Sequence, residues 1–274
     1  MSNPEDVTPT PDEPQEDGLG PSAMWHILVS QSALPAMLNQ ARFQDEVLEA
    51  HGRSEGQRWE YDGKTSQLLF EGVGFFPAQV LGTMAEADGT WLWAFANPSL
   101  PKTATYAAAQ LRDEFAQLDA PTPLAEDVTR RIGVLDAAIV GAWNTEADAY
   151  YVAPTGGGAT AVFLVKHPEL AKRRIPYERL PLAISGILEQ LPVDHQLLIE
   201  GWRRSEPQGI HFAEGPAGSG VITARAEGLP VGEDGRPDPA EGATWRFEFD
   251  EQGRLASIGG TVGEVPEGAD PESD

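Results

Sequence analysis

The sequence predicts an α+β fold in which antiparallel sheets, built from several hairpins, pack against amphipathic helices. Segments with apolar residues at helical spacing alternate with pairs of short strand-like segments, and most of these pairs are joined by glycine-containing turns. The chain has 274 residues, of which 41% are hydrophobic. This is enough apolar material for one large domain or for two smaller lobes.

The first half of the chain is predicted to be a helix followed by hairpins. Ser22 is a candidate N-cap, Gly52 marks the end of the helix, and Pro35 is expected to kink or divide it. Two hairpins are expected next, Gln57–Tyr61 with Ser66–Phe70 and Pro77–Ala85 with Thr90–Ala96. A short amphipathic helix over Thr103–Leu118 closes this half.

The second half begins with the clearest helical period of the chain. Seven apolar positions predict one helix or two: Leu124, Val128, Ile132, Leu135, Ile139, Ala142 and Trp143. A hairpin follows at Ala149–Ala153 and Thr160–Val165, then a helix along Leu180–Leu191 and a second one capped by Asp194. Four further strands are expected at Gly209–Phe212, Val221–Ala226, Thr244–Phe249 and Leu255–Thr261.

Composition divides the chain into four segments. Residues 1–21 and 264–274 are acidic and poor in apolar side chains, so we predict two disordered tails. Residues 22–120 are predicted to form a helix-plus-sheet lobe. Residues 121–263 are predicted to form a helix–hairpin–helix unit with a C-terminal sheet.

The charge of the chain excludes several classes of function. The formal net charge is −24, and a field of this sign repels nucleic acids and anionic membranes. The chain has no cysteine, so disulfides and thiolate sites are excluded. The first 21 residues hold six acids and no Lys or Arg, unlike a secretory signal. We therefore expect a soluble cytoplasmic protein that binds neither nucleic acid nor membranes.

Motifs that carry chemistry are missing. The sequence contains no phosphate loop, dinucleotide fingerprint, nucleophile elbow or H-E-x-x-H zinc motif, and its five histidines are scattered. We predict no cofactor, no metal site and no catalytic residue. Asp194 beside His195, and His211 near Glu214, are the acid–base pairs that come nearest to a catalytic arrangement. An N-cap aspartate next to an exposed histidine explains the first pair equally well.

One aromatic strand carries a resemblance. The run G-T-W-L-W-A-F-A-N, from Gly89 to Asn97, resembles an uncharacterised bacterial family, a domain of unknown function with the pattern W-x-W-x-W-A-N. Phe95 stands where that family often has a different aromatic residue. The similarity covers Trp59–Leu118, with a looser likeness of layout to about Leu191. It implies a fold for this segment and no activity.

The same aromatic residues allow two interpretations. Trp91, Trp93, Asn97 and Trp143 could line an apolar ligand pocket that has one polar group. Alternatively, the strand lies inside a sheet, where its aromatic side chains form core, and Asn97 satisfies backbone groups where the strand ends. The second interpretation is favoured, because Trp91, Trp93 and Phe95 on one face and Leu92, Ala94 and Ala96 on the other make the strand apolar on both sides.

A basic segment stands out from the acidic chain. Its residues are Lys166, Lys172, Arg173, Arg174 and Arg179, together with Arg203 and Arg204. It is either a solvated face or an interaction surface for an acidic tail or an anionic ligand. From the missing motifs and the excess acid we predict a non-enzymatic protein-interaction domain, of antagonist or immunity-like type, whose partner is a basic protein. The alternative is a small-ligand binder, or an enzyme not recognisable from its motifs, with the aromatic pocket described above.

Overall fold

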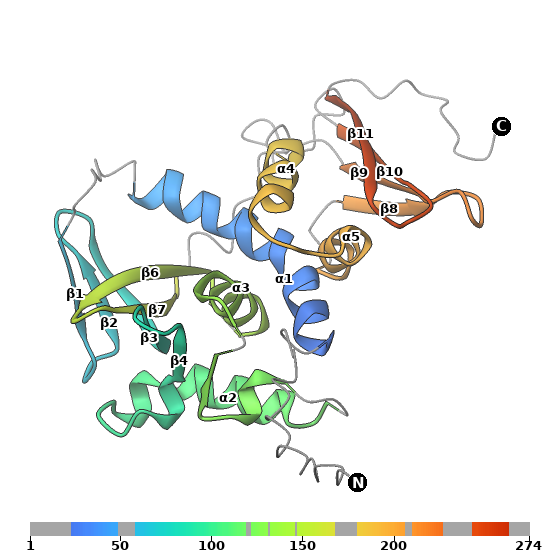
Figure 1. Cartoon of the computed structure of the whole chain (residues 1–274). Helices are drawn as coiled ribbons and strands as arrows, with labels where there is room; N and C mark the ends of the chain where they lie inside the picture. The colour runs from blue at the N-terminus through green and yellow to red at the C-terminus, as the bar shows by residue number, and fades with distance from the viewer. Residues whose placement is uncertain are drawn as a thin grey trace, which may run out of the picture.

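The computed structural model describes residues 23–48, 58–118, 122–130, 132–145, 147–167, 180–205, 210–226 and 243–262. This part of the chain holds five α-helices: α1 (Ala23–Arg42), α2 (Tyr106–Phe115), α3 (Val134–Asn144), α4 (Leu180–Gln190) and α5 (His195–Arg204). A π-helical segment, Phe43–Leu48, extends α1. The described strands form one sheet of seven and one of four, which confirms the α+β fold with antiparallel sheets and hairpins (Figure 1).

The seven-stranded sheet is organised around one long strand. Its members are β1 (Trp59–Asp62), β2 (Gln67–Phe70), β3 (Gly74–Ala85), β4 (Thr90–Trp93), β5 (Val128–Thr129), β6 (Ala149–Gly156) and β7 (Ala159–Val165). The start of β3 pairs with β2, its end pairs with β4, and its other edge pairs with β7 through a bulge between Val80 and Gly82. Because a bulge bends and twists a strand, β3 can serve these different neighbours.

The four-stranded sheet is a meander of β8 (Ile210–Glu214), β9 (Val221–Ala226), β10 (Ala243–Phe249) and β11 (Leu255–Val262). One face of this sheet packs on α5. The Trp202 ring of α5 lies edge-on to three aromatic rings at centroid distances of 5.0 to 6.2 Å, from Phe212, Trp245 and Phe247. These residues alternate along their strands, so the opposite face carries the polar side chains.

Helix α1 lies between the two sheets (Figure 1). On one side the Gln40 side chain accepts a hydrogen bond from the Tyr150 backbone in β6, and Ser32 accepts one from Asn144 in α3. On the other side Ser30 accepts one from the backbone of Asp194, which precedes α5. The helix therefore carries buried residues on more than one face, among them Trp25, Leu34 and Leu38.

Most predicted elements are confirmed within a few residues, and one long helix is not. The segment from Leu124 to Ile132 contains a 3-10 turn at Pro123–Ala125 and strand β5, and α3 begins only after Gly133. Leu124 and Ile132 are buried as predicted, while Val128 is 47% exposed. Pairing of β5 with β4 uses the backbone groups of this segment and overrides the helical period.

Two further local predictions are corrected. The chain forms a 3-10 turn at Ala94–Ala96, where a strand was expected. Pro35 does not divide α1, since a proline removes one backbone hydrogen bond and packing on both sides holds the helix together.

Some predictions fall at or beyond the limits of the described chain. Ser22, Gly52, and residues 1–21 and 264–274 lie outside the described residues. The predicted lobe boundary at residue 120 falls within one sheet, because β5 pairs with β4 and β7 pairs with β3, while β6 joins the sheet through β7.

Candidate functional site

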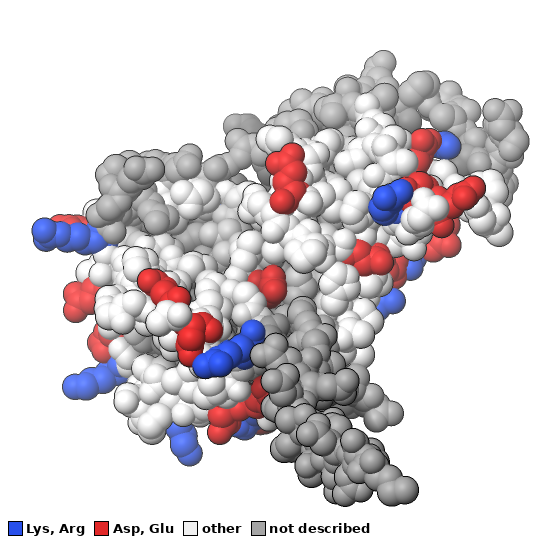
Figure 2. Space-filling model, viewed as in Figure 1, with Lys and Arg blue, Asp and Glu red and all other residues white. Residues whose placement is uncertain are grey.

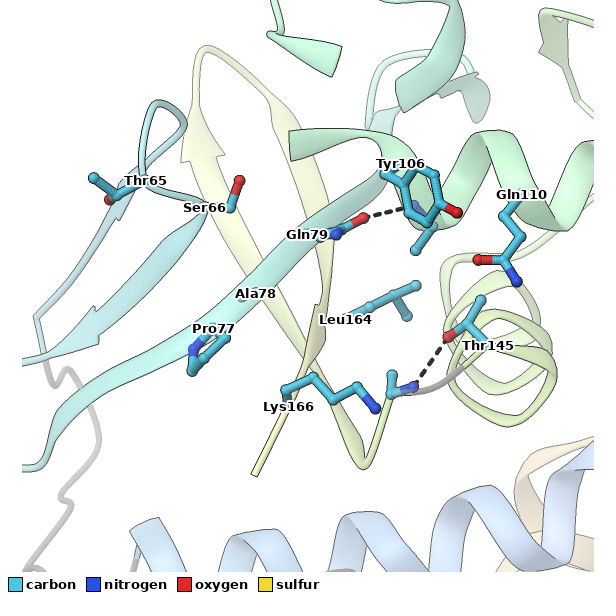
Figure 3. Close-up of a pocket in the computed structure, with 12 residues that line it drawn as sticks. Thr65, Ser66, Pro77, Ala78, Gln79, Tyr106, Gln110, Thr145, Leu164 and Lys166 are labelled. Atoms are coloured by element: carbon cyan, nitrogen blue, oxygen red, sulfur yellow. Dashed lines mark hydrogen bonds between the residues drawn. The ribbon is translucent and has the colours of Figure 1, made fainter. Parts of the chain in front are cut away.

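A pocket of about 360 Å³ lies beside β3, under the first turns of α2 (Figure 3). The turn before β2, strand β3, helix α2, the segment after α3 and the end of β7 all contribute to it. Its lining residues are Thr65, Ser66, Pro77, Ala78, Gln79, Tyr106, Ala107, Gln110, Thr145, Ala147, Leu164 and Lys166.

Gln79 of β3 positions the helix that covers the pocket. Thr105, the residue before α2, makes no side-chain cap. Instead, the Gln79 Oε1 atom accepts a hydrogen bond from the Ala107 backbone N–H at 2.5 Å and acts as the N-terminal cap of α2. The inner face of α2 is held by buried Ala108 and Leu111. The start of α2 is therefore tied directly to the sheet beneath it.

Hydrogen bonds also fix the two amide side chains of the pocket. Because an amide NH2 group cannot accept a hydrogen bond, the Ala107 contact identifies the Gln79 oxygen as the acceptor and leaves the Gln79 Nε2 group as a donor at the pocket wall. In Gln110 the amide nitrogen is the group already used, since its Nε2 donates to Glu114 Oε1 at 2.9 Å. Its Oε1 atom then remains as an acceptor on the pocket side (Figure 3). The pocket thus offers one oriented donor and one oriented acceptor.

The opposite end of the pocket is formed by Lys166 and the turn after α3. The Thr145 hydroxyl donates to the Gly141 carbonyl at 2.8 Å and accepts from the Ala147 N–H, which fixes this turn. The Lys166 backbone N–H donates to the Pro77 carbonyl at 2.8 Å, while its side chain extends toward the turn (Figure 3). Of the lining residues within the described ranges, Lys166 is the charged one.

The wall near β1 and β2 is neutral. The Tyr61 hydroxyl donates to the Ala78 carbonyl at 3.2 Å. Burial raises the pKa of Tyr61, against a hydrogen bond with Ser66 that lowers it. Ser66 has a φ of 54°, a left-handed conformation that is uncommon for a residue other than glycine. This wall supplies polar groups without charge.

The aromatic site predicted from the sequence lies elsewhere. Trp91 and Trp93 are fully buried, with ring centroids 5.4 Å apart, and Trp93 Nε1 donates to the Pro123 carbonyl at 3.1 Å. Asn97 Oδ1 accepts the Ser99 N–H in a turn. Trp143 is half-buried against the core. None of these four residues lines the pocket under α2, and ligand binding by them stays a prediction.

The other predicted candidates are placed as follows. Asp194 caps α5 by accepting the Leu197 N–H at 2.8 Å, and His195 Nδ1 accepts the Leu255 N–H at 2.8 Å, so the two side chains serve different backbone groups. His211 and Glu214 are three residues apart in β8 and so lie on opposite faces of the sheet.

The basic segment is described in part. Arg203 and Arg204 both form salt bridges with Glu200, at 2.6 and 2.8 Å. The other members, Lys172, Arg173, Arg174 and Arg179, lie outside the described residues. Of its described members, Lys166 lines the pocket.

A second hollow of about 380 Å³ lies between α5 and the turn that joins β8 to β9. Much of its wall is the turn Gly215–Gly220, and its carboxylates are those of Glu200 and Glu214. Both carboxylates already face Arg203, at 2.6 and 3.8 Å. The hollow offers few oriented groups to a ligand, so the pocket under α2 is the stronger candidate.

Comparison with known families places the pocket inside a shared domain. The profile of a family of unknown function (DUF6882) matches residues 27–168. The chain belongs to this family. The match runs from the second turn of α1 through α3 and includes the whole seven-stranded sheet and every described residue that lines the pocket. It stops before α4, so α4, α5 and the four-stranded sheet lie beyond the family match.

The other comparisons add no function. No curated protein matches the chain. No solved structure matches it either. None of the helices in the described ranges combines the length and apolar character needed to cross a membrane. Within the same ranges no group of three or more His, Asp or Glu side chains could share a metal ion.

The sequence contained only part of the signal for this pocket. Lys166 stood out as a basic residue, but Gln79 and Gln110 belong to no motif. Their role follows from which hydrogen bonds they already make, and those partners are fixed only by the packing of α2 on β3.

Proposed function

We propose that this chain binds a small organic molecule in the pocket under α2. The observation that carries the proposal is the composition of the lining within the described residues: an oriented amide donor, an oriented amide acceptor and one lysine, beside apolar side chains. The chain has 43 acidic residues against 19 Lys and Arg, yet none of the described lining residues is acidic.

The shape and chemistry of the pocket support the same function. Its volume of about 360 Å³ lies in the range of small-molecule sites. Apolar surface from Pro77, Leu164 and the Tyr106 ring alternates with a few polar groups, as ligand sites require. The groups are held by the sheet, α2 and the fixed turn after α3, so binding needs little rearrangement.

A blocked pocket tests the proposal. Gln110→Trp fills the pocket mouth, whereas Gln117→Trp places the same side chain on an exposed position that does not line it. We would screen a fragment library by two-dimensional amide NMR against both variants and the parent chain. We expect fragments that shift the Ala107 and Ala147 amides in the parent and in Gln117→Trp, but not in Gln110→Trp. Absence of any fragment at these amides in the parent chain would contradict the proposal.

A second candidate is the protein-interaction function predicted from the sequence, an antagonist or immunity-like domain for a basic partner. Charge distribution supports it. The described residues carry 20 acidic and 12 basic side chains, and the remaining segments carry 23 and 7. On the face drawn in Figure 2, acidic and basic side chains are interspersed. The acidic attraction would therefore come mainly from segments outside the described residues.

Neutralising the N-terminal acids tests this second candidate. Replacing the six acids of residues 1–21 by Asn and Gln removes charge without shortening the chain. Retention of the parent chain and of this variant would be compared on immobilised polylysine over a salt gradient, and then on any basic partner captured by the parent. We expect the variant to elute at lower salt and to lose the partner. Capture that is unchanged by the substitutions would count against an acidic docking segment.

A further inference from the structure

We infer that the ligand of this pocket carries an amide whose N–H and C=O groups lie on the same edge, as in a primary carboxamide or a lactam. The inference rests on the proposed function and adds the chemical class of the ligand. Its basis is the pair of glutamines at the start of α2, Gln79 and Gln110, which present opposite halves of their amide groups to the pocket (Figure 3).

The half-buried Gln79 amide offers a donor. Its Oε1 atom already accepts the Ala107 N–H, so the NH2 group is the half left for a ligand. Within the described part of the chain, the Gln79 side chain makes no other hydrogen bond. Because the Ala107 contact fixes the amide at the first turn of α2, the donor is held in place before a ligand arrives.

The half-buried Gln110 amide offers an acceptor. Its NH2 group donates to Glu114, one turn further along α2, and its Oε1 atom makes no hydrogen bond to another described residue. Side chains on a helix lean toward its N-terminus, so Gln110 extends back toward the end at which Gln79 is bound. A ligand without a donor here would leave this oxygen unpaired once water is displaced, and that weakens binding.

One functional group can reach both glutamines. Ala107, to which Gln79 is bonded, and Gln110 lie three positions apart in α2, and side chains at this spacing start about 5–6 Å apart on one helix face. An amide with N–H and C=O on one edge can accept from Gln79 and donate to Gln110 together. A trans peptide group points its N–H and C=O in opposite directions, so it satisfies one glutamine and leaves the other unpaired.

Apolar surface beside the donor suits a compact body that carries this amide. Leu164 of β7 is buried and lies next to Gln79, because the two residues are paired across β7 and β3. The Tyr106 ring lines the same pocket from the first turn of α2. The structure therefore predicts a small ring or chain packed on these two side chains, with its amide edge toward the two glutamines.

Two matched series of probes test the inference. In the carboxamide series, benzamide has both groups on one edge, N-methylbenzamide keeps both groups but holds them trans, and N,N-dimethylbenzamide lacks the N–H. In the lactam series, δ-valerolactam is compared with its N-methyl derivative. Affinity is measured by two-dimensional amide NMR titration of the Ala107 and Ala147 signals.

Three variants assign the effect to the glutamines. In Gln79→Glu the oxygen that accepts the Ala107 N–H is kept, so α2 stays anchored, while the donor becomes an acceptor. Gln110→Met removes the acceptor and keeps a side chain of similar length. Gln117→Met makes the same change at an exposed position that does not line the pocket, and it serves as the control. All three variants should melt within a few degrees of the parent chain.

The expected pattern separates the donor from the acceptor. In the parent chain, benzamide and δ-valerolactam should each bind about tenfold more tightly than their methylated forms. Gln79→Glu should weaken benzamide and N,N-dimethylbenzamide alike, about tenfold, because both use the C=O group. Gln110→Met should weaken benzamide about tenfold and change N,N-dimethylbenzamide less than about twofold, because only benzamide donates an N–H. Gln117→Met should change neither affinity more than about twofold.

Failure of this inference differs from failure of the proposed function. If the methylated probes bind as tightly as the others in both series, or if Gln110→Met leaves benzamide binding unchanged, the ligand class is wrong while small-molecule binding stands. The same holds if screened fragments bind and none of the probes does. A preference in one series alone supports the inference and identifies the amide as carboxamide or lactam. If neither the probes nor any fragment shifts the pocket amides, the proposed function itself is wrong.

Discussion

Gly201 is the residue at which α5 meets α1. A Cβ atom built on Gly201 would overlap the backbone carbonyl of Gln31 in α1, and backbone atoms cannot move aside as a flexible side chain can. A glycine at this position lets the two helices approach closely. Gly186 in α4 is the useful contrast, because the atom nearest to a Cβ there is Gln190 Nε2 at 3.9 Å.

Substituting these two glycines by alanine should change stability in opposite directions. We expect Gly201→Ala to lower the free energy of unfolding by about 1–3 kcal/mol through overpacking. Gly186→Ala should raise it by about 0.5–1 kcal/mol, because alanine restricts the unfolded chain and favours the helix. Urea denaturation followed by circular dichroism measures both values. Equal effects of the two substitutions would contradict the close approach at Gly201.

Tyr150 of β6 gives a second test at the residue scale. Burial raises the pKa of Tyr150 to about 12, from an ordinary value of 10.0. In the unfolded chain this phenol ionises near pH 10. Ionisation therefore stabilises the unfolded state at a lower pH than the folded state. The contribution of the neutral Tyr150 side chain to the stability of the fold is complete below pH 10 and is lost as the pH rises from 10 to 12.

Comparison with Tyr150→Phe isolates this contribution. Between pH 10 and 12 the stability of the parent chain should fall by up to about 3 kcal/mol more than that of the variant. Chemical denaturation at each pH provides the measurement. The contributions of the ionisable groups that both proteins share cancel when the free energy of unfolding of the variant is subtracted from that of the parent chain at each pH. Parallel curves for the two proteins would mean that Tyr150 titrates like an exposed phenol.

At the scale of elements, the helices begin in different ways. Helix α5 starts with its own cap, since Asp194 Oδ1 accepts the Leu197 N–H at 2.8 Å. Helix α2 instead depends on Gln79, a residue of the neighbouring strand. The first kind of start is visible in the sequence because cap and helix are adjacent. The second is not, because 28 residues separate Gln79 from Ala107.

The cap of α5 should be replaceable by another capping residue. Asp194→Ala should lower the free energy of unfolding by about 1 kcal/mol, because it leaves the Leu197 N–H without its partner. Asp194→Ser should restore most of this loss, since a hydroxyl can accept the same hydrogen bond. Thermal and urea unfolding of the pair would test this. A serine variant as unstable as the alanine variant would show that the carboxylate acts in another way.

At the scale of the whole molecule, α1 is shared by two parts of the structure. It packs on α3 and β6 of the family domain, and on α4 and α5, which lie beyond the family match. Neither part by itself covers the whole surface of α1. The hydrogen bonds to Ser30 and Gln40 tie this helix to different elements.

A shared helix predicts one cooperative unfolding transition for both sheets. Urea curves from circular dichroism and from tryptophan fluorescence should superimpose, since Trp93 reports on the first sheet and Trp245 on the second. Two transitions in the parent chain would show that the sheets unfold independently.

The sequence by itself determined the local elements of this protein. Apolar periods, turn glycines and the Asp194 cap predicted the hairpins, α4, α5 and the α+β class, because each signal lies within a few residues of the structure it specifies. The sequence also predicted a domain of unknown function, and a family of that kind matches residues 27–168.

Only the tertiary structure decided how distant segments combine. Pairing of β5 with β4 replaced a helix that the apolar period favoured, and pairing of β7 with β3 joined strands on both sides of residue 120. The pocket arose in the same way, from Gln79 of β3, Gln110 of α2 and Lys166, which directly follows β7. Their chemistry depends on hydrogen bonds made after packing, and no local pattern of residues encodes contacts between segments so far apart in the chain.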